Sequence, residues 1–228
     1  LLAGRDLQAG GTWLGVNRKG YSAALTNYRE PERAGDPEGE SAGALLRSRG
    51  VLVRDFLGGE MTAAEYAAQV SDDGARFSGF NLLLSDGERL VCISNRAGGV
   101  TDIEPGVHGL SNHLLNTDWP KVHAGKQRLQ CLLADHGDLG ADRTDVLAGA
   151  LFDLLTEDAA IAGHFPGGLE AGLTSEHLAR HLFISSPIYG TRCSTVVLQK
   201  QDGSLYFEER RFDASTAETG RDRFDVAL

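Results

Sequence analysis

Two apolar runs on either side of an Asp-Gly turn are the feature that most constrains how this chain can fold. Residues 80–85 and 89–94 are each long enough for one strand, and Asp86 and Gly87 lie between them. An Asp-Gly pair between two such runs is a strong hairpin signal. Because each run is almost continuously apolar rather than alternating, we expect both faces of the resulting sheet to be covered.

A second hairpin is predicted upstream, with a strand over residues 12–17 and a return strand over 21–26. Gly20 lies in the turn, where it can adopt the positive φ that other residues avoid. Helices are expected over 44–57, with a break expected at Gly50, and over 62–70. Thr62 and Glu65 have the spacing of a capping box.

The second half of the chain predicts two more helices and several short strands. One helix begins at Pro120, since proline suits the first turn of a helix, and its partner covers residues 145–155. Further strands are expected over 107–111, 181–185, 194–198, 205–210 and 223–228. Antiparallel hairpins with two inserted groups of helices predict an α+β layered sandwich. With 228 residues, 41% of them hydrophobic, one domain over residues 1–228 is expected.

The composition argues against several classes of protein. The formal net charge is −10, and an acidic surface disfavours nucleic acid, which is bound through Lys and Arg. No stretch of roughly 18 uninterrupted apolar residues occurs, so stable insertion into a membrane is not expected. The three cysteines, Cys92, Cys131 and Cys193, are widely spaced. They predict reduced, partly buried thiols and a cytoplasmic location.

Common catalytic and cofactor motifs are absent from the sequence. It contains no phosphate-binding loop, no dinucleotide-type glycine pattern and no Gly-x-Ser-x-Gly elbow. His177 and His181 would share one face of a helix, but two ligands fall short of a metal site, and a solvated helix end is the simpler interpretation. We therefore predict no metal and no cofactor.

Three polar residues stand at predicted strand ends in otherwise apolar surroundings: Asn27, Asn112 and Arg192. An amide at a strand end can donate to a developing oxyanion, and a guanidinium can fix a carboxylate. Each asparagine could equally be a turn residue that bonds its own backbone, and Arg192 could brace a loop. From the residue types alone, both interpretations stay open.

Short motifs spread over nearly the whole chain resemble the Transport and Golgi organisation 2 family, also called the NRDE family. They are Gly10-Gly11-Thr12-Trp13-Leu14-Gly15, Ala24-Leu25-Thr26-Asn27-Tyr28, Gly79-Phe80-Asn81-Leu82, Gly109-Leu110-Ser111-Asn112, Trp119-Pro120-Lys121 and Tyr189-Gly190-Thr191-Arg192. This family resembles the N-terminal-nucleophile hydrolases, and especially the choloylglycine hydrolase and penicillin V acylase group. The resemblance implies a four-layer αββα sandwich with mostly antiparallel sheets.

The resemblance also implies a shared pocket for the three polar residues. Asn27 lies in a segment similar to the one that carries the oxyanion asparagine of the hydrolase group, and Asn112 matches a second catalytic asparagine. Arg192 stands where that group has its arginine. Family members begin with Met-Cys and then carry Asn-Arg-Asp-Glu, whereas this chain begins at Leu1. We therefore expect the nucleophile to lie outside these residues and the three cysteines to be packing thiols.

Two functions follow from these expectations. In the first, a pocket lined by Trp13, Tyr28 and Ser111 of the Asn112 loop binds or carries a hydrophobic anionic molecule of the haem or acyl-CoA type, with Arg192 facing its carboxylate. Trp13 could instead be a core aromatic residue. In the second, an N-terminal cysteine hydrolyses an amide while Asn27 and Asn112 stabilise the oxyanion.

Overall fold

The computed structural model describes residues 1–29, 46–136, 143–156, 180–186 and 189–227. The chain divides into two compact units, Leu1–Thr117 and Asp118–Leu228, each with its own antiparallel sheet and its own pair of helices. The predicted α+β class with antiparallel sheets is therefore confirmed. Whether the 228 residues act as one domain stays a prediction.

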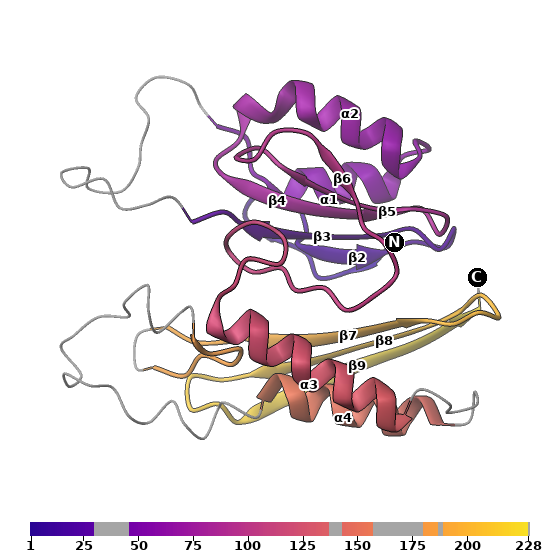
Figure 1. Ribbon diagram of the computed structural model, residues 1–228, viewed down its shortest axis with the longest axis vertical. Coiled ribbons are helices and arrows are strands. Elements are labelled where there is room, and N and C mark those ends of the chain that lie inside the picture. The colour runs from indigo at the N-terminus through magenta and orange to yellow at the C-terminus, as the bar shows by residue number, and fades with distance from the viewer. Residues whose placement is uncertain (30–45, 137–142, 157–179, 187–188, 228) are drawn as a thin grey trace. The chain divides into compact units, whose positions relative to one another are not determined.

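The first unit is built on an antiparallel sheet of order β1-β2-β3-β4-β5-β6 (Figure 1). The strands are Leu2–Ala3, Leu14–Val16, Ser22–Asn27, Phe80–Ser85, Leu90–Ser94 and Val100–Asp102. Both predicted hairpins are confirmed as the pairs β2–β3 and β4–β5. Gly20 has φ 80°, so the first turn uses the freedom that only glycine offers without strain.

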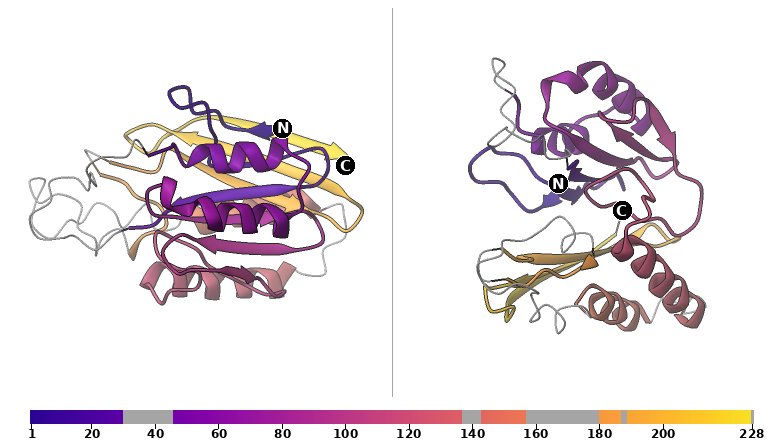
Figure 2. Two further views of the ribbon diagram at one scale, coloured as in Figure 1. Left: turned by 90° about the horizontal axis from the view of Figure 1, so that it is seen from above. Right: turned by 60° about the vertical axis from the view of Figure 1, so that its left-hand side comes forward.

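Helices α1 (Gly50–Gly58) and α2 (Ala63–Asp73) lie side by side on one face of this sheet, and the short 3₁₀ turn Gly74–Arg76 follows α2 (Figures 1 and 2). Leu52, Val53 and Phe56 of α1 are buried in one apolar core with Leu82 and Leu84 of β4. The capping box predicted at the start of α2 is confirmed. The Tyr66 hydroxyl donates to the Leu52 carbonyl, which links the two helices.

Helix α1 begins at Gly50, whereas the sequence predicted a helix from residue 44 that Gly50 interrupts; residues 44 and 45 lie outside the described part. At Gly50 the backbone closely crosses the segment that precedes β2. The Gly50 carbonyl accepts a hydrogen bond from Thr12 N–H at 3.0 Å. A Cβ atom added to Gly11 would lie 2.4 Å from the Gly50 carbonyl carbon, so glycine at position 11 permits this approach.

The strand predicted over residues 107–111 is wrong, because this segment belongs to an irregular stretch between β6 and α3. Its polar groups are satisfied locally and by side chains instead of by a neighbouring strand. Thr26 Oγ1 donates to the Ser111 carbonyl at 2.7 Å. Asn116 N–H donates to the Gly109 carbonyl, and Gly109 N–H donates to Asn116 Oδ1. Apolar residues were therefore a misleading signal for a strand here.

The second unit contains helices α3 (Pro120–His136) and α4 (Thr144–Thr156) and a sheet of order β7-β8-β9. The strands are Cys193–Gln199, Ser204–Phe212 and Glu218–Ala227. The two helices run alongside each other, and α4 packs on the sheet through Ala148 and Phe152 against Val196 and Tyr206 (Figure 2). Pro120 is the first residue of α3, as predicted.

The strand predicted over 181–185 is wrong in extent, since only Ser185 forms a bridge, with Gly190. The segment folds back on itself instead. Thr191 N–H donates to the Ile184 carbonyl, and Ile184 N–H donates to Thr191 Oγ1. These bonds use the backbone groups that a continuing strand would need, so the strand stops.

Candidate functional site

The end of β3 and the loop around Asn112 form a connected cluster in the first unit. Asn27 is the last residue of β3 and pairs with Phe80 of β4. Beyond it, Tyr28 N–H donates to the Gly79 carbonyl at 2.9 Å, and Arg29 N–H donates to the Asn112 carbonyl at 2.7 Å. The chain leaving the strand is therefore fixed on one side by β4 and on the other by the Asn112 loop.

The side chain of Asn112 is a clamp between these two segments. Its Nδ2 donates to the backbone carbonyl of Asn27 at 3.1 Å. The Ser111 hydroxyl lies 3.5 Å from Asn112 Oδ1. The sequence predicted that Asn112 follows a strand, and this prediction is wrong. Asn112 lies in a loop, and one of its amide N–H groups holds that loop against β3.

Tyr28 and His113 form a second link across the cluster. The Tyr28 hydroxyl lies 3.0 Å from His113 Nε2, and His113 Nδ1 lies 2.9 Å from Thr117 Oγ1. Thr117 Oγ1 already donates its one proton to the Leu114 carbonyl. In the neutral imidazole, Nδ1 therefore carries the proton, and Nε2 accepts from Tyr28.

Asn81 of β4 contacts the cluster on the face of the sheet opposite α1 and α2. It is fully buried, and its Nδ2 donates to both Thr26 Oγ1 (3.1 Å) and the His113 carbonyl (2.8 Å). Its Oδ1 has no partner within the described part of the chain. The sequence carried a signal for this residue that we did not interpret, namely a polar side chain inside an apolar strand.

Asn27 itself presents a different kind of amide. The residue is exposed, and its side-chain oxygen and nitrogen make no hydrogen bond to any residue that the structure describes. Of the two asparagines proposed for the site, one thus holds the backbone and the other remains available. An available amide at a fixed strand end can donate to, or accept from, a bound molecule.

Trp13 precedes β2 and is 41% exposed, so the alternative interpretation as a core aromatic residue is wrong. Its backbone carbonyl accepts from Leu25 N–H, which fixes Trp13 alongside β3. The Arg49 guanidinium lies over the indole ring, 5.8 Å from its centroid, and also donates to the Gly79 carbonyl at 2.9 Å. Sequence reasoning missed Arg49, because only the fold brings it beside Trp13.

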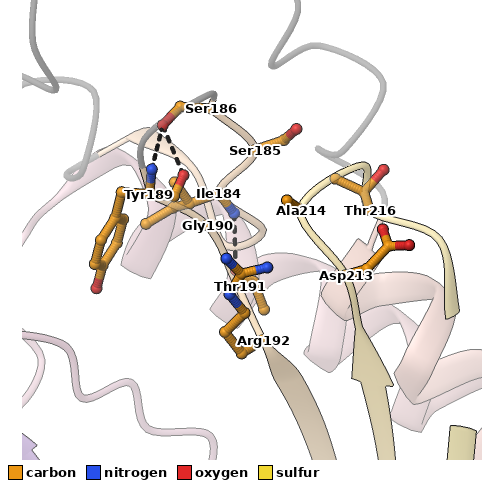
Figure 3. Close-up of a pocket in the computed structure, with 10 residues that line it drawn as sticks. All are labelled: Ile184, Ser185, Ser186, Tyr189, Gly190, Thr191, Arg192, Asp213, Ala214 and Thr216. Carbon is orange, nitrogen blue, oxygen red and sulfur yellow. Dashed lines mark hydrogen bonds between the residues drawn. The ribbon is translucent and has the colours of Figure 1, made fainter. Parts of the chain in front are cut away.

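Arg192 belongs to the second unit, and its convergence with Asn27 and Asn112 stays a prediction. It lines a small hollow of about 40 Å³ between residues 184–186 and 189–192 on one side and the turn after β8 on the other (Figure 3). Asp213 lies on the far side of this hollow (Figure 3). Hydrogen bonds from Ser215 and Ala217, together with the charge of Arg192, lower the pKa of the Asp213 carboxyl group. Residues 187 and 188 of this segment lie outside the described part.

The cysteines differ more than the sequence suggested. Cys92 is buried, and burial raises the pKa of its thiol to about 11, so it is a packing thiol as predicted. Cys131 and Cys193 are exposed residues, so the prediction that they are packing thiols is wrong, although the Cys193 sulfur itself is partly covered. Cys131 lines an open hollow between α3 and α4, and Cys193 begins the edge strand β7. Burial of the Cys193 sulfur and the Glu209 carboxylate raise the pKa of that thiol.

The sequence profile of Transport and Golgi organisation 2 matches residues 1–214. The chain belongs to the Transport and Golgi organisation 2 family. It is 32% identical to the mouse Transport and Golgi organization 2 homolog, over 99% of this chain and 83% of that protein. It is also 34% identical to the homologs of cattle and human, in each case over 92% of this chain and 76% of the relative.

Four of the six motifs that carry the family resemblance meet in this Transport and Golgi organisation 2 family member at one end of the first sheet, whereas those of Trp119 and Arg192 belong to the second unit. Those of Trp13, Asn27, Asn81 and Asn112 are joined there by the hydrogen bonds described above. Within the described ranges, no helix is both long and apolar enough to cross a membrane, and no group of three or more potential ligands is arranged around a metal position.

Proposed function

We propose that this family member binds or carries a hydrophobic, anionic small molecule of the haem or acyl-CoA type at the end of β3. The observation that supports it best is the available amide of Asn27, exposed at a strand end whose backbone is held on both sides. Tyr28 and the exposed indole of Trp13 supply apolar surface, and Ser111 fixes the loop through its carbonyl. Arg192 faces the carboxylate of the ligand in this proposal.

The same proposal includes the four-layer αββα sandwich, in which the two sheets stack with the helices outside. Side chains alternate along a strand, so the face of β7–β9 away from α4 carries apolar Val197, Leu205 and Phe207. The face of the first sheet away from α1 and α2 carries Leu83 and Cys92. Two sheets that each have an apolar second face support face-to-face stacking.

The cytoplasm is the proposed location, and small molecules are the proposed partners. All three cysteines are free thiols, as in proteins of reducing compartments. A net charge of −10 supports the absence of nucleic acid among the partners.

An N-terminal-cysteine amidohydrolase is the second candidate function. The unengaged Asn27 amide favours it, because an oxyanion needs a positioned N–H donor that no ground-state partner occupies. In this case Asn112 positions Asn27 through its hydrogen bond to the Asn27 carbonyl, and the nucleophile is supplied by a residue other than Cys92, Cys131 or Cys193.

The experiment compares the full-length protein with its Asn27→Asp variant, which keeps the side-chain shape and removes the N–H donor. Binding of haemin and palmitoyl-CoA is measured by calorimetry, and turnover is measured on amide and thioester substrates. Saturable binding without turnover supports the binding function. A fall in turnover of roughly 10²–10³-fold at unchanged affinity supports the hydrolase. If the wild type shows no binding and no turnover, both proposed functions are rejected.

A further inference from the structure

Arg49 is a guanidinium held in place next to the candidate site. It lies immediately before α1, donates Nη1–H to the Gly79 carbonyl at 2.9 Å and stacks over Trp13. The same Gly79 carbonyl accepts from Tyr28 N–H. A single carbonyl oxygen therefore ties Arg49 to the residue that follows Asn27.

No carboxylate balances this cation within the described ranges. Three other arginines of the first unit do have a carboxylate partner: Arg54 pairs with Asp55, Arg76 with Asp73 and Arg89 with Asp102. Arg49 is also partly buried, and this burial lowers the pKa of its guanidinium. Removing a cation from water without an opposite charge is unfavourable, and a bound anion would relieve that cost.

The remaining N–H groups of Arg49 suit such an anion. A guanidinium has five N–H donors in a planar fork that matches the oxygens of a carboxylate or a phosphate. The described structure uses one of these donors, on Gly79. The guanidinium carbon lies over the Trp13 ring, 5.8 Å from its centroid, and the other N–H donors have no hydrogen-bond partner within the described ranges.

We infer that Arg49, oriented by Trp13 and Gly79, binds carboxylate or phosphate oxygens of a ligand at the end of β3. This inference rests on the proposed function for the identity of the site, but its chemistry is its own. It makes Arg49 the residue of the first unit that selects for an anionic group. Arg192 in the second unit lies across a small hollow from Asp213, whose carboxylate already interacts with its charge.

The test measures Kd by calorimetry on the full-length protein with four probes. Laurate carries a carboxylate, lauroyl-CoA carries phosphates, methyl laurate carries no charge, and inorganic pyrophosphate carries charge without an apolar chain. Trp13 fluorescence, assigned by its loss in the Trp13→Phe variant, reports binding next to Arg49. The variants are Arg49→Gln and Arg49→Lys, and the control is Arg54→Gln, on the helix that follows Arg49.

Arg49→Gln should raise Kd for the carboxylate or the phosphate probes by roughly 10- to 100-fold, the usual range for a charged hydrogen bond. Arg49→Lys should fall between, because it keeps the charge and loses the fork. The Kd of methyl laurate should not change in Arg49→Gln, and the Kd of every probe should stay unchanged in Arg54→Gln. Whether laurate or the phosphate probes respond identifies the anionic group.

Two outcomes overturn the inference. One is an unchanged Kd for every charged probe in Arg49→Gln; the other is an equal loss for methyl laurate, which would indicate a structural role. Binding of pyrophosphate that depends on Arg49, without binding of any lauroyl probe, retains the inference and rejects the proposed function. Tight binding of the lauroyl probes that does not depend on Arg49 retains the proposed function and rejects the inference. If no probe binds, both the inference and the proposed function are rejected.

Discussion

The Tyr28 hydroxyl and His113 Nε2 are 3.0 Å apart, and the two rings are tilted by 35° with centroids separated by 5.0 Å. This contact joins the residue after β3 to the loop that carries Asn112. The contact is partly buried, and because a hydrogen bond within a folded protein contributes about 1 kcal/mol, Tyr28→Phe should lower the free energy of unfolding by about that amount. Urea denaturation measures the change. Tyr189→Phe, at an exposed tyrosine, is the control, and equal losses in both variants would contradict the role of this contact.

Gly11→Ala should destabilise the first unit strongly. The new Cβ would lie 2.4 Å from the carbonyl carbon of Gly50, and backbone atoms cannot move aside as a flexible side chain does. Overpacking of this kind costs roughly 1–3 kcal/mol or more. Thermal unfolding should show a lowered Tm. Gly4→Ala is the matched control, since nothing lies within 4 Å of its added Cβ, and a similar Tm loss there would refute the crossing as the cause.

Asp86 should make stability depend on pH in acid. Burial opposes its charge, but hydrogen bonds from the N–H groups of Ala63, Arg89 and Glu88 outweigh burial and lower the pKa of its carboxyl group. A folded-state pKa below the unfolded value of about 3.9 stabilises the protein above that pH, and the benefit disappears as pH falls through the folded pKa.

Asp86→Asn should therefore have a lower urea midpoint than the wild type at pH 7. The difference should shrink as pH falls below about 4. Urea denaturation at a series of pH values measures it. Asp72→Asn, at an exposed residue of α2, should leave the midpoint at pH 7 unchanged. A difference for Asp86→Asn that stays constant down to pH 2 would argue against the assigned hydrogen bonds.

Thiol reagents should separate the cysteines. With its pKa raised to about 11 by burial, Cys92 has a thiolate fraction of roughly one part in a thousand at pH 8 and little access to reagent. Cys131 is exposed and should react within the native state. Labelling with a chromogenic disulfide, followed by peptide mass mapping, should find Cys92 modified only in denaturant. Rapid native labelling of Cys92 would contradict its packing.

The parts of the fold that the sequence predicted correctly are those with local causes. The Asp86-Gly87 hairpin, the Thr62–Glu65 capping box and the helix start at Pro120 each depend on residues a few positions apart. The strand predicted over residues 107–111 was wrong because this segment is held by hydrogen bonds with Thr26 and Asn116. The spacing of apolar residues in the sequence does not reveal such bonds.

The candidate site was predictable only in outline. The resemblance selected Asn27 and Asn112, but residue types could not tell that the Asn112 amide is engaged while the Asn27 amide is not. Arg49 escaped notice because its importance lies in contacts with Trp13 and Gly79, both distant in the sequence. Such contacts depend on how helices and strands pack, and short motifs do not contain that information.

The loop that carries Asn112 is attached to the sheet by separate hydrogen bonds rather than by a strand ladder. They involve the side chains of Thr26, Tyr28, Asn81 and Asn112 and the N–H of Arg29, and each is worth about 1 kcal/mol. Breaking them costs less than separating β3 from β4, which would also expose the apolar core. Amide protons of residues 105–117 should therefore exchange with solvent long before those of Leu82 and Leu84. Local opening would then uncover the strand end while the sheet stays intact, so a ligand could be admitted and released without global unfolding.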